Sequence, residues 1–129
     1  MTNQIQMAND RINNRIYDLE ERTARVGEDL IEFAKKLEKN SINNPLISQV
    51  VRSGTSMGAN YMEADCADSK KDFIYKISLC KKESKETCHW LRMIAKANPE
   101  CLNQCRKLWQ ESHELTLIFS KIILSSKSK

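Results

Sequence analysis

The chain has 129 residues and a net charge of +4, which suits one domain with a modest hydrophobic core. Three glycines and two prolines leave few turns, and a composition poor in aromatic residues favours helices over strands. No apolar run is long enough to cross a bilayer, the N-terminus lacks the pattern of a secretory signal, and five cysteines cannot all pair. We therefore expect an all-α cytoplasmic protein with reduced thiols.

Residues 1–17 are rich in Asn, Gln and Arg and predict a weakly ordered or helical N-terminal extension. Asp18 can cap the first main helix, which we expect to continue to about Lys39. Apolar and small residues recur there at spacings of three and four, which is typical of a helix with one buried face. The stripe consists of Leu19, Thr23, Val26, Leu30, Phe33 and Leu37.

The second helix is predicted from Asn44, as its cap, and Pro45, at its first position, to about Asp65. Gly54 and Gly58 lie inside this helix, where each glycine costs roughly 1 kcal/mol relative to alanine. A close crossing with another helix, within the bundle or between subunits, would offset that cost. A ligand groove is the alternative.

Ser69, with Asp72 three residues later, predicts the start of the third helix, and Asn98 before Pro99 predicts the start of the fourth. Four amphipathic helices with short loops predict an antiparallel up-down-up-down four-helix bundle over residues 18–126. The expected core positions are Phe73, Ile77, Cys80, Ser84, Cys88, Leu91 and Ala95 in the third helix, and Cys101, Cys105, Leu108, Ser112, Leu115, Phe119 and Ile122 in the fourth.

The sequence does not predict a metal site or a cofactor. Cys101 and Cys105 lie four residues apart, and His113 follows two turns later, but four of the five cysteines fall on the apolar stripes. On such positions cysteine acts as a small buried side chain, and the chain has no Cys-x-x-Cys pair. Glu86 and His89 form one Glu-x-x-His motif, whereas a di-iron bundle needs two.

Catalytic nucleophiles are not predicted either. Ser53 and Ser56 lie on the second helix without a histidine on the same helix, and no glycine-rich loop follows a strand. We therefore expect a protein that is not an enzyme and has no catalytic residue.

A set of polar residues lies along one face of the second helix, with two carboxylates on the third. One interpretation is a polar stripe in solvent; the other is a buried or interfacial network in which Arg52 pairs with a carboxylate of the third helix. The second is favoured because Met57 and Tyr61 leave little room for a fully hydrated face. The residues concerned are Arg52, Ser56, Asn60 and Glu63 on the second helix and Glu83 and Glu86 on the third.

The basic excess of the chain lies in residues 69–97, which contain 8 basic and 3 acidic residues. It either keeps the protein soluble or binds phosphate groups of RNA or DNA. No aromatic interleaving supports base stacking here. The candidate phosphate-binding residues are Lys70, Lys71, Lys81, Lys82 and Lys85.

Residues 52–64 read Arg-Ser-Gly-Thr-Ser-Met-Gly-Ala-Asn-Tyr-Met-Glu-Ala, and residues 69–73 read Ser-Lys-Lys-Asp-Phe. Together with residues 18–23 and 82–91, these stretches resemble the four-helix-bundle proteins encoded in intervening sequences of bacterial 23S ribosomal RNA genes. The resemblance covers about residues 18–125, and its Arg-Ser-x-x-Ser-x-x-x-Asn block is fairly specific.

The resemblance implies a bundle that assembles as a homopentameric ring, without established catalytic residues. A related accessory protein of diversity-generating retroelements is similar in shape and is thought to bind nucleic acid and a reverse transcriptase. We therefore expect a non-enzymatic, oligomeric RNA-binding or ribonucleoprotein accessory factor. The alternative is a structural adaptor that contacts a protein partner and does not bind nucleic acid.

Overall fold

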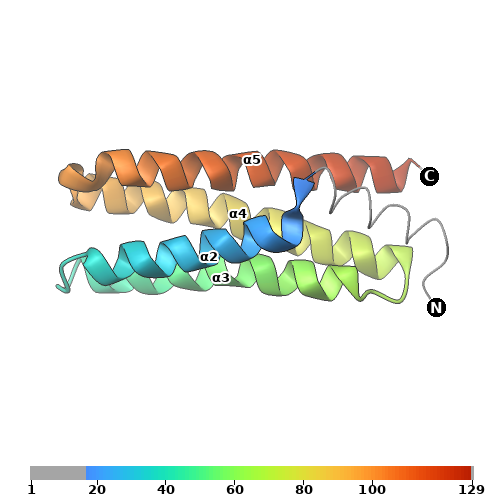
Figure 1. The fold of residues 1–129 in the computed structure, drawn as a ribbon, viewed down its shortest axis with the longest axis horizontal. Helices are drawn as coiled ribbons and strands as arrows, with labels where there is room; N and C mark the ends of the chain where they lie inside the picture. Colours follow the sequence, from blue (N-terminus) through green and yellow to red (C-terminus); the bar gives the residue numbers. More distant parts are fainter. Residues whose placement is uncertain (1–16, 129) are drawn as a thin grey trace.

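The computed structural model describes residues 17–128, so the extension predicted for residues 1–17 lies outside them apart from Tyr17. The described part contains helices and no strand, which confirms the all-α prediction. The long helices lie side by side, and each runs opposite to the one before it (Figure 1). Their bounds are α2 Leu19–Lys36, α3 Asn43–Asp65, α4 Lys70–Ala97 and α5 Leu102–Lys127, with the short 3-10 helix η1 Pro99–Cys101 before α5.

We refer to α2 and α3 as the first hairpin and to α4 and α5 as the second hairpin. Helix α4 packs extensively against both α3 and α5, whereas α2 packs mainly against α3 and contacts α5 much less. None of the helices in residues 17–128 is long and apolar enough to span a bilayer.

The start of α4 is as predicted, but the start of α2 differs in detail. Ser69 Oγ accepts a hydrogen bond from Asp72 N at 3.0 Å, which satisfies an N–H group of the first turn. Asp18 precedes α2, but its side chain makes no capping hydrogen bond. Its backbone is left-handed, with a φ of 50°, and only its carbonyl joins the helix, by accepting a hydrogen bond from Arg22 N.

The predicted cap Asn44 is wrong, whereas Asn98 stands before Pro99 at the start of η1 as predicted, but without a capping hydrogen bond from its side chain. Helix α3 begins at Asn43, and Asn40 Oδ1 instead accepts hydrogen bonds from the N–H groups of Ile42 and Asn43, at 3.0 and 2.8 Å. The Asn98 amide does not cap η1 but exchanges two hydrogen bonds with the Asn43 amide, at 3.0 and 2.9 Å. Both amides are buried, so their polar groups need partners inside the protein, and they close one end of the bundle.

Helix α2 ends at Lys36, three residues before the predicted end at Lys39. Leu37 leaves the helix in an extended conformation while its side chain stays buried. The Lys39 ammonium donates hydrogen bonds to the carbonyls of Ala34 and Leu37, at 2.8 and 2.7 Å. The ammonium is thus a second donor to the Ala34 carbonyl, which also accepts a hydrogen bond from Leu37 N at 3.2 Å, and it bonds the Leu37 carbonyl just beyond the helix end.

The core contains the whole stripe predicted on the first helix, from Leu19 to Leu37. In α4 the buried face is displaced: Thr87 and Ile94 are buried, whereas Cys88 and Ala95 are only partly covered. The displacement arises because α4 must face α3 and α5 at the same time.

Two pairs of hydroxyl groups cross this core. Ser53 Oγ and Thr87 Oγ1 lie 2.9 Å apart and join α3 to α4, and Ser84 Oγ and Thr116 Oγ1 lie 2.7 Å apart and join α4 to α5. All four residues are buried, so these bonds satisfy hydroxyl groups that water cannot reach. The hydroxyl of Ser53 is therefore part of the core and not exposed to a substrate.

Candidate nucleic-acid interface

Arg52 joins α3 to α4 through both of the carboxylates singled out in the sequence. Its Nη1 lies 3.1 Å from Glu83 Oε2, and its Nη2 donates a hydrogen bond to Glu86 Oε2. The hydrogen bond to Glu86 and the charges of the two carboxylates raise the pKa of Arg52 above its ordinary value. Arg52 itself is exposed, but the Glu83 side chain is only 12 % exposed, so this ion-pair cluster lies at the edge of the helix interface.

The other members of the predicted network do not join this cluster. Asn60 Nδ2 donates a hydrogen bond to the Ser56 carbonyl on its own helix, at 3.0 Å. Glu63 lies 3.5 Å from the Lys76 ammonium on α4, farther along the same interface. The predicted stripe therefore divides into an Arg52 cluster and a separate contact between Glu63 and Lys76.

A second arginine, which sequence reasoning missed, joins α2 to α5. Arg22 donates two hydrogen bonds to Glu111, at 2.9 and 2.8 Å, and its Nη2 also lies 3.2 Å from Glu114. The bond to Glu111 contributes most to raising the pKa of Arg22. In the sequence, Arg22 stands next to the core residue Thr23, and Glu111 stands next to the core residue Ser112. Opposite charges beside the apolar stripes of two helices were therefore the sequence signal that could have indicated this ion pair.

The glycines of α3 lie against α2 within the same chain. A Cβ atom on Gly54 would come within 2.1 Å of Leu30 Cδ1. A Cβ on Gly58 would meet Thr23 at 3.5 Å, and one on Gly27 of α2 would meet Thr55 at 3.5 Å, both ordinary contact distances. Only Gly54 therefore requires the absence of a side chain.

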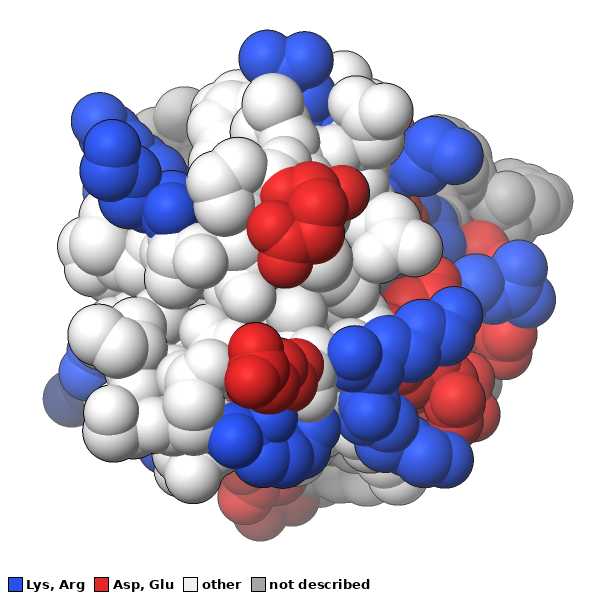
Figure 2. All heavy atoms as spheres, turned by 90° about the vertical axis from the view of Figure 1, so that its left-hand side faces the viewer, with Lys and Arg blue, Asp and Glu red and all other residues white. Residues whose placement is uncertain are grey.

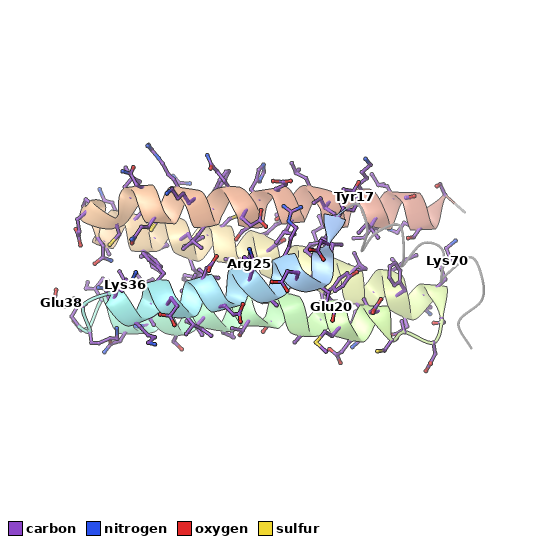
Figure 3. The ribbon with its side chains drawn as sticks, in the orientation of Figure 1. Tyr17, Glu20, Arg25, Lys36, Glu38 and Lys70 are labelled. Carbon is purple, nitrogen blue, oxygen red and sulfur yellow. The ribbon has the colours of Figure 1, made fainter. Side chains whose placement is uncertain are left out.

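A shallow groove runs along the outside of the first hairpin, and we call it the acidic groove. Its floor consists of small residues such as Ala24, Gly27 and Gly58, and the side chains of Ile31 and Met62 beside it are 40 % and 62 % exposed. Its acidic members are Glu20, Glu21 and Glu28 on α2. Figure 3 labels Glu20 on this helix.

The five candidate lysines do not form one cluster. Lys81 is partly buried and the other four are exposed. Lys70 and Lys71 line a hollow with Ile74 of α4 and Lys127 of α5, and Figure 3 places Lys70 at the opposite end of the bundle from Lys36 and Glu38. Eleven residues separate Lys71 from Lys82, or roughly 16 Å along a helix.

A longer line of basic residues continues from Lys82 toward the end of α4. Its members follow one another at spacings of three, four, three and four residues, so they share one side of the helix. All are exposed, and sequence reasoning missed the last three. This basic stripe consists of Lys82, Lys85, His89, Arg92 and Lys96. Figure 2 looks along the bundle from the end that holds η1, where Lys and Arg lie around the periphery and acidic side chains lie nearer the middle, among uncharged residues.

The five cysteines are all unpaired. Burial is the main cause of raised pKa values at three thiols. The pKa of Cys80 is raised to about 12, and those of Cys88 and Cys105 are raised to about 11. These thiols therefore stay protonated at neutral pH, a form that neither attacks electrophiles nor binds metal well. Within residues 17–128, no three His, Cys, Asp or Glu side chains are placed to hold a metal ion.

Residues 13–121 match the family described as 23S rRNA-intervening sequence protein. The fold is also similar to a crystal structure of a protein from the S23 ribosomal protein family of Bacteroides thetaiotaomicron, whose function is given as unknown. That similarity has a TM-score of 0.73 at 27 % sequence identity, and it covers 81 % of this chain and 97 % of the other. Among curated protein sequences, none matches this chain.

Proposed function

Since this chain belongs to the 23S rRNA-intervening sequence protein family, we propose that it is a non-enzymatic cytoplasmic protein that binds RNA as a homo-oligomer. It would act as an accessory factor of a ribonucleoprotein. The basic stripe on α4 is the observation that carries this proposal.

The surface around the stripe is basic because arginines of the first hairpin form ion pairs with the neighbouring carboxylates of the second hairpin. Residues 70–127 contain 12 Lys and Arg and 6 Asp and Glu. Four of those six carboxylates pair with Arg22 or Arg52 of the first hairpin, and the lysines and the arginine of the stripe are left to face solvent. Exposed cations in a line along one helix suit the evenly spaced phosphates of a nucleic-acid backbone.

The acidic groove supports the homo-oligomeric part of the proposal. Small residues on its floor allow a helix of a second copy to approach closely, and the exposed Ile31 and Met62 provide apolar contacts. Its glutamates complement the basic second hairpin of another copy, and a contact between different faces leads to a closed ring or a filament. We propose a homopentameric ring, in which several weak phosphate contacts would act together.

The binding experiment measures affinity for a single-stranded RNA at several salt concentrations. Changing Lys81, Lys82 and Lys85 together to Gln should weaken binding to all sequences about equally and reduce the salt slope by about 2, near 0.7 per lost phosphate contact. The matched control changes Arg25, Lys35 and Lys36 to Gln, which removes the same charge from exposed positions of α2. Equal losses in the two triple variants would mean that net charge, and not the position of these lysines on α4, governs binding.

The oligomer experiment measures the molar mass of the full chain in solution. A homopentamer has five times the mass of the 14.9 kDa chain. Changing Met62 to Glu should shift the mass toward one copy and weaken RNA binding at the same time. A pentameric wild type that fails to bind any RNA at low salt would instead support the adaptor function, with the acidic groove as its protein contact.

A further inference from the structure

A pocket of about 330 Å³ lies between α4 and α5, beside the basic stripe. Its volume is near the lower end of the range of small-molecule sites, roughly 300–1,000 Å³. Leu91 of α4 and Leu102 and Cys105 of α5 supply apolar surface, and Trp109 also lines it. Arg92 and Arg106 are the charged residues of its lining, so the pocket combines an apolar surface with two cations.

Trp109 presents an aromatic surface at this pocket. Its side chain is 39 % exposed, and its ring stacks on His113, with ring centroids 4.7 Å apart and an angle of 16° between the planes. The stack joins two rings on the exposed side of α5. The neighbouring helix thus supplies an aromatic surface beside the end of the basic stripe at Arg92.

The two arginines of the pocket differ from Arg22 and Arg52. The ion pairs of the described residues involve neither Arg92 nor Arg106, and both side chains are exposed. Their guanidinium groups can therefore meet an external anion without first breaking an internal pair.

We propose that this pocket holds an unpaired base of a single-stranded nucleic acid, stacked on Trp109, with the adjoining phosphates on Arg92 and Arg106. An aromatic face accepts any base, so the site would tolerate many sequences. In a duplex the bases stay stacked on one another, so a duplex could contact the arginines through its phosphates but could not place a base in the pocket. This inference rests on the proposed function and adds a preference for single strands over duplexes.

The test uses the full chain with Trp90 changed to Phe, so that Trp109 is the only tryptophan. A single-stranded 20-nucleotide oligo-U should quench the Trp109 fluorescence, and an RNA duplex of the same length should not. Changing Trp109 to Leu in the wild-type chain should lower affinity for oligo-U roughly 5- to 100-fold, as expected for the loss of base stacking, with little change for the duplex.

Two further variants separate binding from folding. Tyr75 is 57 % exposed on α4 and does not line the pocket, so changing it to Leu should leave both affinities unchanged. Changing Arg92 and Arg106 together to Gln removes exposed cations without touching the core, and it should weaken oligo-U binding and flatten its salt dependence.

Three outcomes would overturn the inference. Equal affinities for oligo-U and duplex, unchanged by Trp109→Leu, would remove the base pocket and leave the basic stripe as the binding surface. A change of oligomeric mass in Trp109→Leu, with oligo-U affinity unchanged, would assign the pocket to contact with a second copy. Failure of the wild type to bind either RNA at low salt would remove the proposed function together with the pocket.

Discussion

The two hairpins of this bundle are held together differently. In the first hairpin, Gly54 has no side chain where Leu30 fills the space, and the helices meet closely. In the second hairpin, the Ser84 and Thr116 hydroxyls bridge the helices, and the Cys88 thiol lies 3.7 Å from the Trp109 carbonyl. The interface between α2 and α3 therefore depends on the absence of a side chain at Gly54, and the interface between α4 and α5 depends on hydrogen bonds between polar groups.

The hairpins also differ in the charge that they expose. Arg22 and Arg52 of the first hairpin pair with glutamates of the second, and within the first hairpin Arg25 pairs with Glu21. The first hairpin presents glutamates around the acidic groove, and the second presents the basic stripe. The net charge of a segment therefore does not decide the charge of a surface, because ion pairs between segments remove particular side chains from it.

Core truncations should have the largest effect, and they test whether both hairpins share one core. Leu30 and Leu115 are fully buried and Phe33 is nearly so, and changing each to Ala should lower the free energy of unfolding by about 2–5 kcal/mol in urea denaturation. Leu117→Ala is the control, because Leu117 is 56 % exposed on α5. A loss for Leu115 but not for Leu30 and Phe33 would show that the first hairpin unfolds separately.

Alanine substitutions of the two glycines test the close crossing of the first hairpin. Gly54→Ala would force the buried Leu30 to move and should lower the free energy of unfolding by about 1–3 kcal/mol. Gly58→Ala meets Thr23 only at ordinary contact distance and should raise it by up to about 1 kcal/mol, because alanine favours helix. Thermal and urea denaturation would measure both, and equal effects would contradict the difference in packing.

The fold was predictable from the sequence because hydrophobic periodicity is a local signal. The stripe from Leu19 to Leu37 and the Ser69 cap depend on residues within one or two turns, and both are confirmed. Asn44 was misread as the cap of α3, and the Asn98 side chain, although it stands at the start of η1, pairs with Asn43 instead of capping. The Asn43 amide that pairs with Asn98 lies 55 residues away in sequence, and no local pattern indicates that contact.

The candidate site was only partly predictable for the same reason. Arg52 and its two glutamates follow from helix spacing once two adjacent helices are assumed. The pairing of Arg22 with Glu111 spans 89 residues and joins the first and last helices of the bundle. Trp109 lies near the basic stripe only because α5 folds back along α4, so the pocket between them required the tertiary structure.

Alkaline pH should weaken the junction of the two hairpins, where the Cys80 thiol lies 3.6 Å from the Met57 carbonyl. Below its unfolded pKa of about 9.0 the thiol is protonated in both states, and its contribution to stability is fully present. Above pH 9 the unfolded chain ionises while burial keeps the folded thiol protonated up to about pH 12, so stability is lost as pH rises.

Between pH 8 and 9.5, the wild type should lose about 1 kcal/mol more unfolding free energy than Cys80→Ala. The comparison uses the change with pH in each protein, because the variant also leaves a cavity that lowers its stability at every pH. Parallel pH dependences in urea denaturation would show that the Cys80 thiol is not held away from solvent.

The ion pairs between the hairpins should contribute least to stability and most to the distribution of surface charge. Arg52→Ala leaves Glu83 largely covered without its partner, and we expect a loss of about 0.5–1 kcal/mol, because the arginine itself is exposed. Lys35→Ala removes an exposed pair with Glu32 within α2 and should change stability by less than about 0.5 kcal/mol. The Arg52 loss should shrink in 1 M salt, which screens the exposed side of the cluster. A loss that salt does not change would mean that Arg52 stabilises the bundle through packing of its aliphatic stem, and the separation of charge between the hairpins would then be unrelated to stability.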